Sequence, residues 1–255
     1  MTLDLHCHSR FSVDSRADMA SYCRRARELG VDAICFTDHV DYNELYDGKP
    51  YYDPDGYWRE LAAARESYPQ LRLLSGMEFS EAHLFQPELA ALKSRGYDMV
   101  MGSCHVWYEN VFISQIIERN LISMEESYRL YWEALLAMVR AGGFQVLGHI
   151  DFPKRYYRQI LHDEHKIREI CRTAVEQGIC LEINTSSLRK GLDEPMPGRH
   201  ILDIYRQEGG INITIGSDAH QPEDLAAGRE EAREIAEGFI EVMFVQGERV
   251  EVGGL

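Results

Sequence analysis

Short apolar or β-branched runs alternate with amphipathic segments along this chain of 255 residues, and that rhythm constrains the fold more than any other feature. Parallel strands joined by helical crossovers produce such a pattern, because the strands are buried and the helices cover the sheet. Seven runs predict strands: Thr2–His6, Val31–Phe36, Leu71–Met77, Asp98–Gly102, Phe144–Gly148, Ile179–Asn184 and Ile211–Gly216. The chain is therefore predicted to be an α/β protein.

Helix start and stop signals support the intervals between these runs. Ser123 opens a capping-box pattern, and Gly30 and Gly178 stand where two helices should end. The predicted helices are Ala17–Leu29, Trp58–Ser67, a long helix from Ser123 to Gly142, Glu164–Gln177 and Glu223–Glu237. The last segment, Phe239–Val252, is expected to be a terminal strand or a hairpin. No linker, low-complexity run or internal repeat divides the chain, so residues 1–255 are predicted to form a single domain.

Composition narrows the class of partner and the compartment. The formal net charge of -15 argues against an extended nucleic-acid or anionic-membrane surface, because phosphate backbones are bound mainly through Lys and Arg. No apolar run is long enough to span a bilayer, and Met1 leads into a polar segment unlike a signal peptide. The six cysteines form no CxxC pair and lie mostly in apolar segments. A cytoplasmic protein is predicted, with neither nucleic acid nor membrane as partner, and its oligomeric state stays open.

Side chains that can bind metal follow the predicted strands rather than being scattered. They are His6, His8, Asp38, His39, Glu78, His105, His149, Asn184, Asp218 and His220. In a closed parallel barrel the carboxyl ends of the strands converge on one face, where the following loops build the active site. Residues far apart in the sequence are therefore expected to meet around one pocket.

The opening stretch "LDLHCHSRFSVDS" carries two histidines separated by one residue. Alternate side chains of a strand share a face, so Asp4, His6 and His8 are expected to point the same way. Two imidazoles on one face suit a metal ion, although two half-buried histidines that satisfy each other's hydrogen bonds are the alternative. Together with "TDH", "GME", "GSCH", "GHID" and "GSDAH", each after its own strand, the pair favours a metal site.

The ordered series "DLHCHSRFSVDS", "FTDHVD", "GMEFS", "GSCH", "LGHIDFPKRY", "LEINTSSLRKG" and "TIGSDAH" resembles the PHP (polymerase and histidinol phosphatase) superfamily. Within that superfamily it is most similar to the stand-alone histidinol-phosphate phosphatases. The resemblance spans nearly the whole chain, and its motifs are specific as an ordered set. It implies a distorted (β/α)7 barrel, similar to a TIM barrel, with a trinuclear metal site.

The resemblance also implies a set of ligands for three divalent transition-metal ions. They are His6, His8, Glu78 and Asp218 for the first ion, Glu78 as a bridge with His105 and His149 for the second, and Asp14, His39 and His220 for the third. Nitrogen and oxygen ligands without a thiolate fit Zn, Fe or Mn. Asp4 and Asp38 are expected to orient imidazoles through the second ring nitrogen, and the alternative is a strand-end or N-cap aspartate.

Neighbouring divalent ions lower the pKa of a shared water and clamp the oxygens of a phosphoryl group, so the implied activity is a metal-dependent phosphatase in which metal-bound hydroxide attacks phosphorus. Arg158 and Arg189 match phosphate-binding arginines of the family. The alternative for each is a solvated surface residue. Lys154, Arg155 and Lys190 are expected to be surface charges.

The predicted substrate is L-histidinol phosphate, a small-molecule phosphate ester of histidine biosynthesis. Glu81 could pair with its amine, and the other expected members of the pocket are His83, Trp107 and Tyr108, with a solvated loop as the alternative. The segments "FSEAHLFQPEL" and "HVWYEN" depart from the family pattern where substrate side groups should lie. A phosphodiesterase or nuclease of the same superfamily, or a metal-binding domain without turnover, are the alternative functions.

Overall fold

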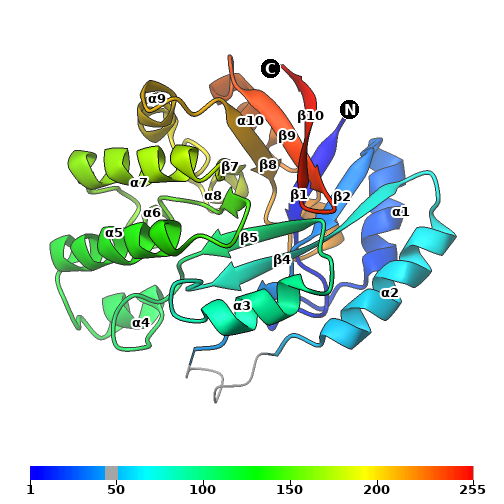
Figure 1. The fold of residues 1–255 in the computed structure, drawn as a ribbon, viewed down its shortest axis with the longest axis horizontal. Coiled ribbons are helices and arrows are strands. Elements are labelled where there is room, and N and C mark those ends of the chain that lie inside the picture. Colours follow the sequence, from blue (N-terminus) through cyan, green and yellow to red (C-terminus); the bar gives the residue numbers. More distant parts are fainter. Residues whose placement is uncertain (44–50, 255) are drawn as a thin grey trace.

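The computed structural model describes residues 1–43 and 51–254, and its strands form one mostly parallel sheet with helices packed around it (Figure 1). All seven predicted strands are present: β1 (Leu3–Cys7), β2 (Ala33–Phe36), β4 (Arg72–Ser80), β5 (Met99–Ser103), β6 (Val146–Leu147), β7 (Cys180–Asn184) and β8 (Asn212–Gly216). Three more strands are β3 (His39–Val40), β9 (Ile240–Val245) and β10 (Glu248–Gly254). The predicted α/β class is confirmed.

The sheet follows the chain in the order β1-β2-β4-β5-β6-β7-β8-β9-β10, with β3 beside β4. Every pair from β1 to β9 is parallel. The chain that follows β8 returns to β1, because Cys7 and Ala219 form a parallel bridge and the His8 amide donates to the Ala219 carbonyl at 2.8 Å. The two ends of the seven-strand path therefore meet at the carboxyl ends of the strands, as in a barrel.

The C-terminal segment is a hairpin, the second of the two expected forms. β9 joins β8 in parallel, and β10 folds back on β9. Three apolar side chains of β9, Val242, Met243 and Phe244, belong to one buried cluster with residues of the other strands. Those residues are Leu3, Leu5, Ala33, Cys35, Leu74, Met99, Met101, Val146 and Cys180. β9 thus covers the end of the barrel interior that lies away from the histidines.

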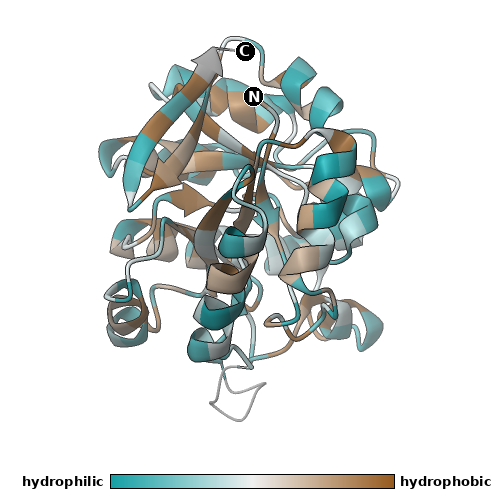
Figure 2. Ribbon diagram, turned by 90° about the vertical axis from the view of Figure 1, so that its right-hand side faces the viewer, coloured by the Kyte–Doolittle hydropathy of each residue, from teal (hydrophilic) through white to brown (hydrophobic). Residues whose placement is uncertain are grey.

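The helices present apolar residues to the strands and polar residues outward (Figure 2). They are α1 (Met19–Leu29), α2 (Pro54–Ser67), α3 (Gln86–Lys93), α4 (Ile113–Glu118), α5 (Met124–Ala141), α6 (Lys154–Tyr157), α7 (Glu164–Glu176), α8 (Ser186–Arg189), α9 (Arg199–Gln207), the 3-10 helix η2 (Pro222–Asp224) and α10 (Arg229–Ile235). The expected caps are present, since the Ser123 side chain accepts from the Glu126 amide and Gly30 is left-handed. In the described part of the chain, no helix is both long and apolar enough to cross a membrane.

The prediction of one continuous helix over Glu223–Glu237 is wrong. The chain instead makes η2, a turn and then α10. Ala226 has a φ of 56° and donates its amide to the Asp4 carboxylate at 2.7 Å, which a continuous helix would not allow. Gly228 has a φ of 76°, and a Cβ there would lie 2.9 Å from side-chain atoms of Leu188 and Thr185. Tertiary contacts therefore break the helical pattern at this turn.

Candidate metal centre

β1 delivers His6 and His8 to the carboxyl end of the sheet through an irregular stretch. Between Asp4 and Cys7, β1 carries one residue more than its partner β2, which is the signature of a β-bulge. Strict alternation of side chains is lost at such a bulge. His6 and His8 still face each other, and their Nε2 atoms lie 2.9 Å apart.

Because of this bulge, the Asp4 side chain points away from the face that carries His6 and His8. Its carboxylate accepts hydrogen bonds from the Ser217 amide at 2.8 Å and from the Ala226 amide at 2.7 Å. The expectation that Asp4 orients an imidazole is corrected, because its hydrogen bonds come from the amides of Ser217 and Ala226, the Ser217 hydroxyl and the His6 amide, and none of these is a ring nitrogen. Asp4 instead fixes the segment that carries Asp218.

The second ring nitrogens of His6 and His8 have partners that determine their tautomers. Nδ1 of His6 lies 2.6 Å from a Glu182 oxygen, and a carboxylate can only accept, so this Nδ1 carries the proton. Nδ1 of His8 lies 2.9 Å from Ser12 Oγ, whose own proton goes to Asp38 at 2.9 Å. Asp38 therefore orients His8 through a serine hydroxyl rather than directly. Both Nε2 atoms are left with lone pairs for a cation.

The Glu78 carboxylate lies at the centre of the cluster, with imidazoles on both of its oxygens. Oε2 lies 2.9 Å from His39 Nδ1, 3.3 Å from His6 Nε2 and 3.5 Å from His8 Nε2, while Oε1 lies 2.8 Å from His149 Nε2 and 3.4 Å from His105 Nε2. Ser103 donates its hydroxyl to Oε1 at 2.6 Å and holds the carboxylate in place. One side chain thus joins two groups of imidazoles, the geometry of a bridging ligand.

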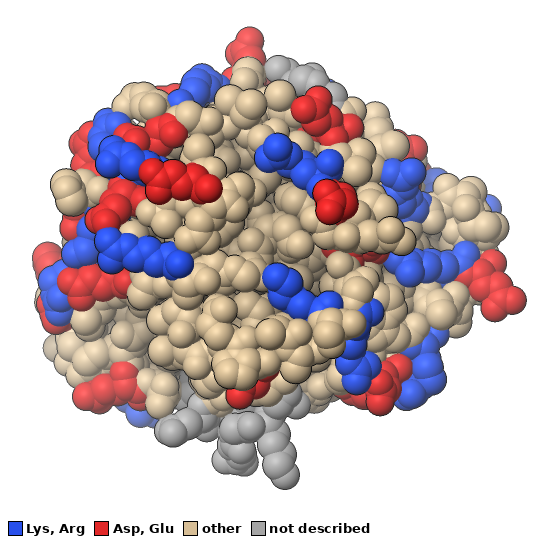
Figure 3. Space-filling model, viewed as in Figure 1, with Lys and Arg blue, Asp and Glu red and all other residues tan. Residues whose placement is uncertain are grey.

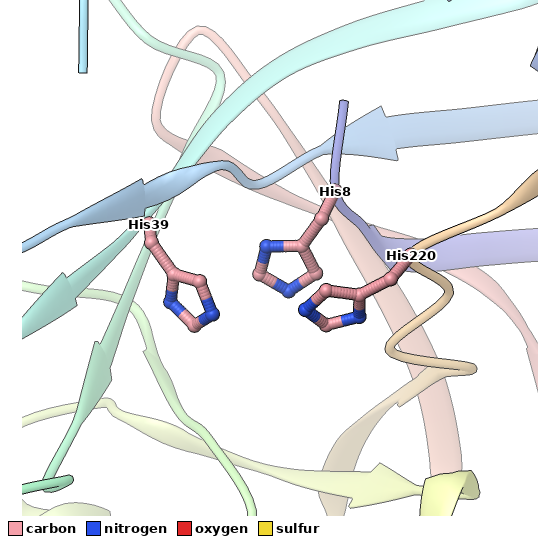
Figure 4. A group of neighbouring side chains, drawn as sticks. All are labelled: His8, His39 and His220. Carbon is pink, nitrogen blue, oxygen red and sulfur yellow. The ribbon is translucent and has the colours of Figure 1, made fainter. Parts of the chain in front are cut away.

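A third group lies toward the opening of the site. The rings of His8, His39 and His220 converge from β1, β3 and the chain after β8 (Figure 4). The Asp14 carboxylate lies 3.0 Å from His220 Nε2 and 3.7 Å from His39 Nε2. Asp218 Oδ1 lies 3.2 Å from His8 Nε2 and connects this group with the first. The structure therefore brings all nine predicted ligands together.

The backbone at two of these residues is strained. His149 and Asp218 have φ values of 20° and 55°, which non-glycine residues rarely adopt. Such conformations cost roughly 1–3 kcal/mol each and persist where the surrounding structure enforces them, often at functional sites.

Unpartnered polar atoms in the cluster fit bound cations. Glu78 Oε2, His39 Nδ1 and His149 Nδ1 are buried without a hydrogen bond, although the first two are only 2.9 Å apart. The facing lone pairs of His6 and His8 repel each other unless a cation lies between them. The donors are nitrogen and oxygen atoms without a thiolate, which suits Zn, Fe or Mn. Three groups, each with ligand atoms within 4.8 Å of one another, are His8-His39-His220, His6-His8-Asp218 and His39-Glu78-His105.

The charge states of His8 and Glu78 suit metal ligation. For His6, His39 and His105, burial lowers the pKa, but surrounding carboxylates outweigh it and raise that pKa in the metal-free protein. Burial lowers the pKa of His8 well below its usual value, and positive charge on His220 and His39 lowers it further, so the imidazole is neutral. Burial alone would raise the pKa of Glu78, but His39 and His6 outweigh it and hold that pKa well below the usual range. A neutral imidazole and an ionised carboxylate are the forms that bind a metal ion.

A cavity of about 200 Å³ opens onto the cluster. Its lining comprises Val13, Asp14, His39, Asp41, Glu78, His105, Phe112, His149, Phe152, Arg155, Tyr156, Asp218 and His220. A wider cleft of about 820 Å³ shares Asp14, Arg155, Tyr156, Asp218 and His220 with this cavity and adds Arg158, Arg189 and Lys190. The approach to the cluster thus carries four basic side chains together with the carboxylates of Asp14, Asp218 and Asp224.

Arg155 is not a surface charge, and this prediction is corrected. Its side chain is only 16% exposed and donates to Asp218 Oδ2 at 2.5 Å and to the Ser186 hydroxyl. Its Nε is buried without a partner. Lys154 is also buried, in an ion pair with Asp151 at 2.8 Å, whereas Lys190 is exposed as expected.

The two arginines that were expected to bind phosphate lie farther out. Arg158 is exposed, and its guanidinium donates to the carbonyls of Lys190 and Gly191 rather than pointing at the cluster. Arg189 donates to the carbonyls of Ser217 and Asp218 at 2.7 and 3.1 Å, while its Nη1 is buried and unpartnered. Both line the outer cleft.

The expected substrate pocket is corrected as well, because Glu81, His83, Trp107 and Tyr108 do not line the cavity at the cluster. The Trp107 indole donates to Ser127 at 3.2 Å and packs against α5. Glu81 lines a separate cavity of about 260 Å³.

Glu182 was missed in the sequence, although a carboxylate within the buried run "CLEIN" requires a polar partner. It lies on β7, bonds His6 Nδ1 and accepts the His149 amide at 2.9 Å. It therefore orients candidate ligands from two groups.

Glu182→Gln should weaken metal binding by about 10- to 100-fold, because an amide nitrogen would face one of these donors. Titration of metal-free protein against a chelator of known affinity measures the effect. The matched control is Glu176→Gln, at the exposed end of α7, which should bind metal like the wild type. Equal metal affinity in Glu182→Gln and wild type would contradict the orienting role.

The sequence of this chain is similar to a known domain family and to proteins named as phosphatases. Residues 4–186 match the family model described as the PHP domain. A protein of Thermotoga maritima named "Probable histidinol-phosphatase" is 29% identical over 250 residues, which cover 97% of each chain. The histidinol-phosphatase of Lactococcus lactis is 27% identical and covers 86% of this chain and 84% of its own.

The fold has a close counterpart among crystal structures. The histidinol phosphate phosphatase of Lactococcus lactis, complexed with zinc, L-histidinol and phosphate, superposes with a TM-score of 0.80. The alignment covers 98% of both chains at 23% sequence identity. The barrel-like path of the sheet is therefore one that another chain also adopts.

Proposed function

The chain belongs to the PHP domain family, and from that premise we propose that it is a metal-dependent phosphatase that hydrolyses L-histidinol phosphate to L-histidinol and phosphate. The observation that carries the proposal is the Glu78 carboxylate, which has imidazoles on both oxygens and a cavity opening onto it. Divalent ions bound there would lower the pKa of a water molecule and neutralise charge on phosphoryl oxygens.

The nine clustered side chains are proposed as the ligands of three ions. His6, His8, Glu78 and Asp218 would hold the first, Glu78, His105 and His149 the second, and Asp14, His39 and His220 the third. Two arginines of the chain would then bind and position the phosphoryl group. Arg155 lies beside Asp218 with an unpartnered Nε, so its planar guanidinium can donate to non-bridging phosphate oxygens. Arg189 has an unpartnered Nη1 in the adjoining cleft and can draw the phosphate inward. In the overall reaction an oxygen from water bonds to phosphorus, the ester P–O bond breaks and the departing alkoxide takes up a proton.

The surface and the thiols support a small substrate and a reducing compartment. On the face shown in Figure 3, acidic and basic side chains are interspersed, which suits a small ester better than a polyanion. All six cysteines are free and buried, which supports the prediction of a cytoplasmic location.

Metal-loaded protein should hydrolyse L-histidinol phosphate with a kcat/KM at least about tenfold above the values for p-nitrophenyl phosphate and a nucleoside monophosphate. A panel that also contains a phosphodiester measures this preference. Chelation of the metal should abolish turnover of every substrate, and adding back Zn, Mn or Fe should restore it. A faster reaction with the phosphodiester would overturn the monoesterase proposal, and a faster reaction with the nucleotide would overturn the histidinol assignment.

A further inference from the structure

Lys154 is a buried lysine that the proposed reaction does not use. Its side chain is only 5% exposed and lies at the start of α6, directly before Arg155. The ammonium has three donors, and each has an acceptor: Asp151 Oδ2 at 2.8 Å, Glu194 Oε1 at 3.2 Å and the Pro195 carbonyl at 3.0 Å. No donor is left for a ligand, so any effect of Lys154 on the reaction must pass through its neighbours.

The short helix α6 depends on contacts outside itself. Forming a single helical turn costs more conformational entropy than its first hydrogen bond offsets, so such a turn persists where tertiary contacts hold it. Among the four described residues of α6, Lys154 alone is buried, and no side chain caps the start of the helix. Arg158, which ends the turn, is exposed. The three hydrogen bonds of Lys154 are therefore the buried anchor of α6.

This anchor attaches α6 to the segment that follows α8. The Ser187 hydroxyl, on α8, donates to the Glu194 carbonyl at 2.7 Å and holds one acceptor of Lys154 in place. Ser186, also on α8, accepts a hydrogen bond from Arg155. α6 is thus tied to the chain after β7 at two points, one through the anchor and one through the arginine beside it.

The other parts of the site near α6 have supports of their own. His149 donates its amide to Glu182 at 2.9 Å. Arg189 donates to the Ser217 carbonyl at 2.7 Å. Loss of the anchor should therefore displace Arg155 and leave the metal ligands and the second arginine where they are.

We propose that Lys154 is a positioning residue, which anchors α6 to the chain after β7 and so presents Arg155 to the phosphoryl group. This inference rests on the proposed function and deepens it. Because Lys154 acts through Arg155, removal of its charge should weaken phosphate binding and turnover in the wild-type background and have little effect once Arg155 has been replaced.

The first test is a double-mutant cycle measured by turnover. Lys154→Met keeps the length of the side chain and removes the charge. In metal-loaded protein it should lower kcat/KM for L-histidinol phosphate and for p-nitrophenyl phosphate by about 10- to 100-fold, because a guanidinium that is misplaced stabilises the phosphoryl group less well. In the Arg155→Met background the same substitution should change kcat/KM by less than about threefold, since the two residues act on one path. A merely structural lysine would lower activity by the same factor in both backgrounds.

A second variant and a control accompany this cycle. Lys154→Met alone leaves Asp151 buried without a cation, so the variant that combines it with Asp151→Asn removes both charges and keeps an acceptor for the Gly198 amide. Lys166→Met is the matched control, because Lys166 pairs with Glu133 at 3.2 Å but lies on α7, outside the lining of the cavity and the cleft. It should behave like the wild type. Elemental analysis and thermal unfolding check metal content and folding.

The second test repeats the cycle without turnover, by calorimetry with inorganic phosphate. Binding should be about 10- to 100-fold weaker in Lys154→Met and should change by less than about threefold in the Arg155→Met background. Equal factors in both backgrounds, loss of metal in proportion to the loss of binding, or wild-type kinetics and phosphate affinity in both Lys154 variants would overturn the inference. If the phosphate cycle shows the coupling but the wild type hydrolyses no phosphomonoester, the proposed function fails while the positioning role stands.

Discussion

Replacing Glu78 with glutamine should lower kcat/KM for a phosphomonoester by about 1000-fold or more and remove part of the bound metal. The carboxylate presents one anionic oxygen to His39, His6 and His8 and the other to His149 and His105. Glutamine has a single carbonyl oxygen, so an amide nitrogen must point at one of the two groups. It also lacks the negative charge that attracts cations to both.

Elemental analysis and steady-state kinetics on the same preparation measure this effect. Glu81→Gln is the matched control for metal content, because Glu81 is also buried, lies three positions away and belongs to none of the ligand groups. It should retain the wild-type number of ions. A Glu78→Gln variant with full metal content and activity would refute the bridging role.

Arg155→Met should lower kcat/KM by about 100- to 1000-fold, since it removes a charge-assisted contact to the phosphoryl group in a site shielded from water. Methionine keeps much of the side-chain volume, so packing against Phe152 changes little. Metal content should stay close to the wild-type value, because Arg155 contacts Oδ2 of Asp218 while Oδ1 faces His8.

Arg158→Met is the comparison variant, because the sequence predicts that Arg158 binds phosphate whereas the structure places Arg155 next to the cluster. Arg158 is exposed and its guanidinium is engaged with two backbone carbonyls, so its replacement should have a much smaller effect than that of Arg155. Kinetics with L-histidinol phosphate and p-nitrophenyl phosphate measure both variants. A larger loss in Arg158→Met than in Arg155→Met would reverse the assignment.

The sequence predicted the strands well because burial on both faces gives parallel strands a continuous apolar signature. Polar residues at the carboxyl ends of such strands, such as Glu78 within the last residues of β4 and His105 just beyond β5, are then placed by the topology alone. The nine candidate ligands could be found in this way together with the family motifs. Their grouping depends on which strands are neighbours, and the order of the strands in the sheet follows the chain.

The errors arise where tertiary structure overrides local pattern. One extra residue in β1 turns Asp4 away from the histidines, and periodicity does not reveal a bulge. The single-turn helix α6 places Arg155 over the cluster, and the left-handed Arg158, with a φ of 62°, turns outward. Glu182 acts through a contact 176 positions away in the sequence, which no local motif records.

Because β9 covers one end of the barrel interior, the barrel cannot close until β9 has been synthesised. The strand lies against Leu3 and Leu5, the earliest core residues in the chain, and Arg229 ties the two regions by donating to the Leu3 carbonyl and to both oxygens of Glu241. A ribosome must therefore synthesise residues up to Val245 before β9 can cover the residues of the first strand. Until then the nascent chain exposes an apolar floor, so this barrel can close only after translation has passed β9.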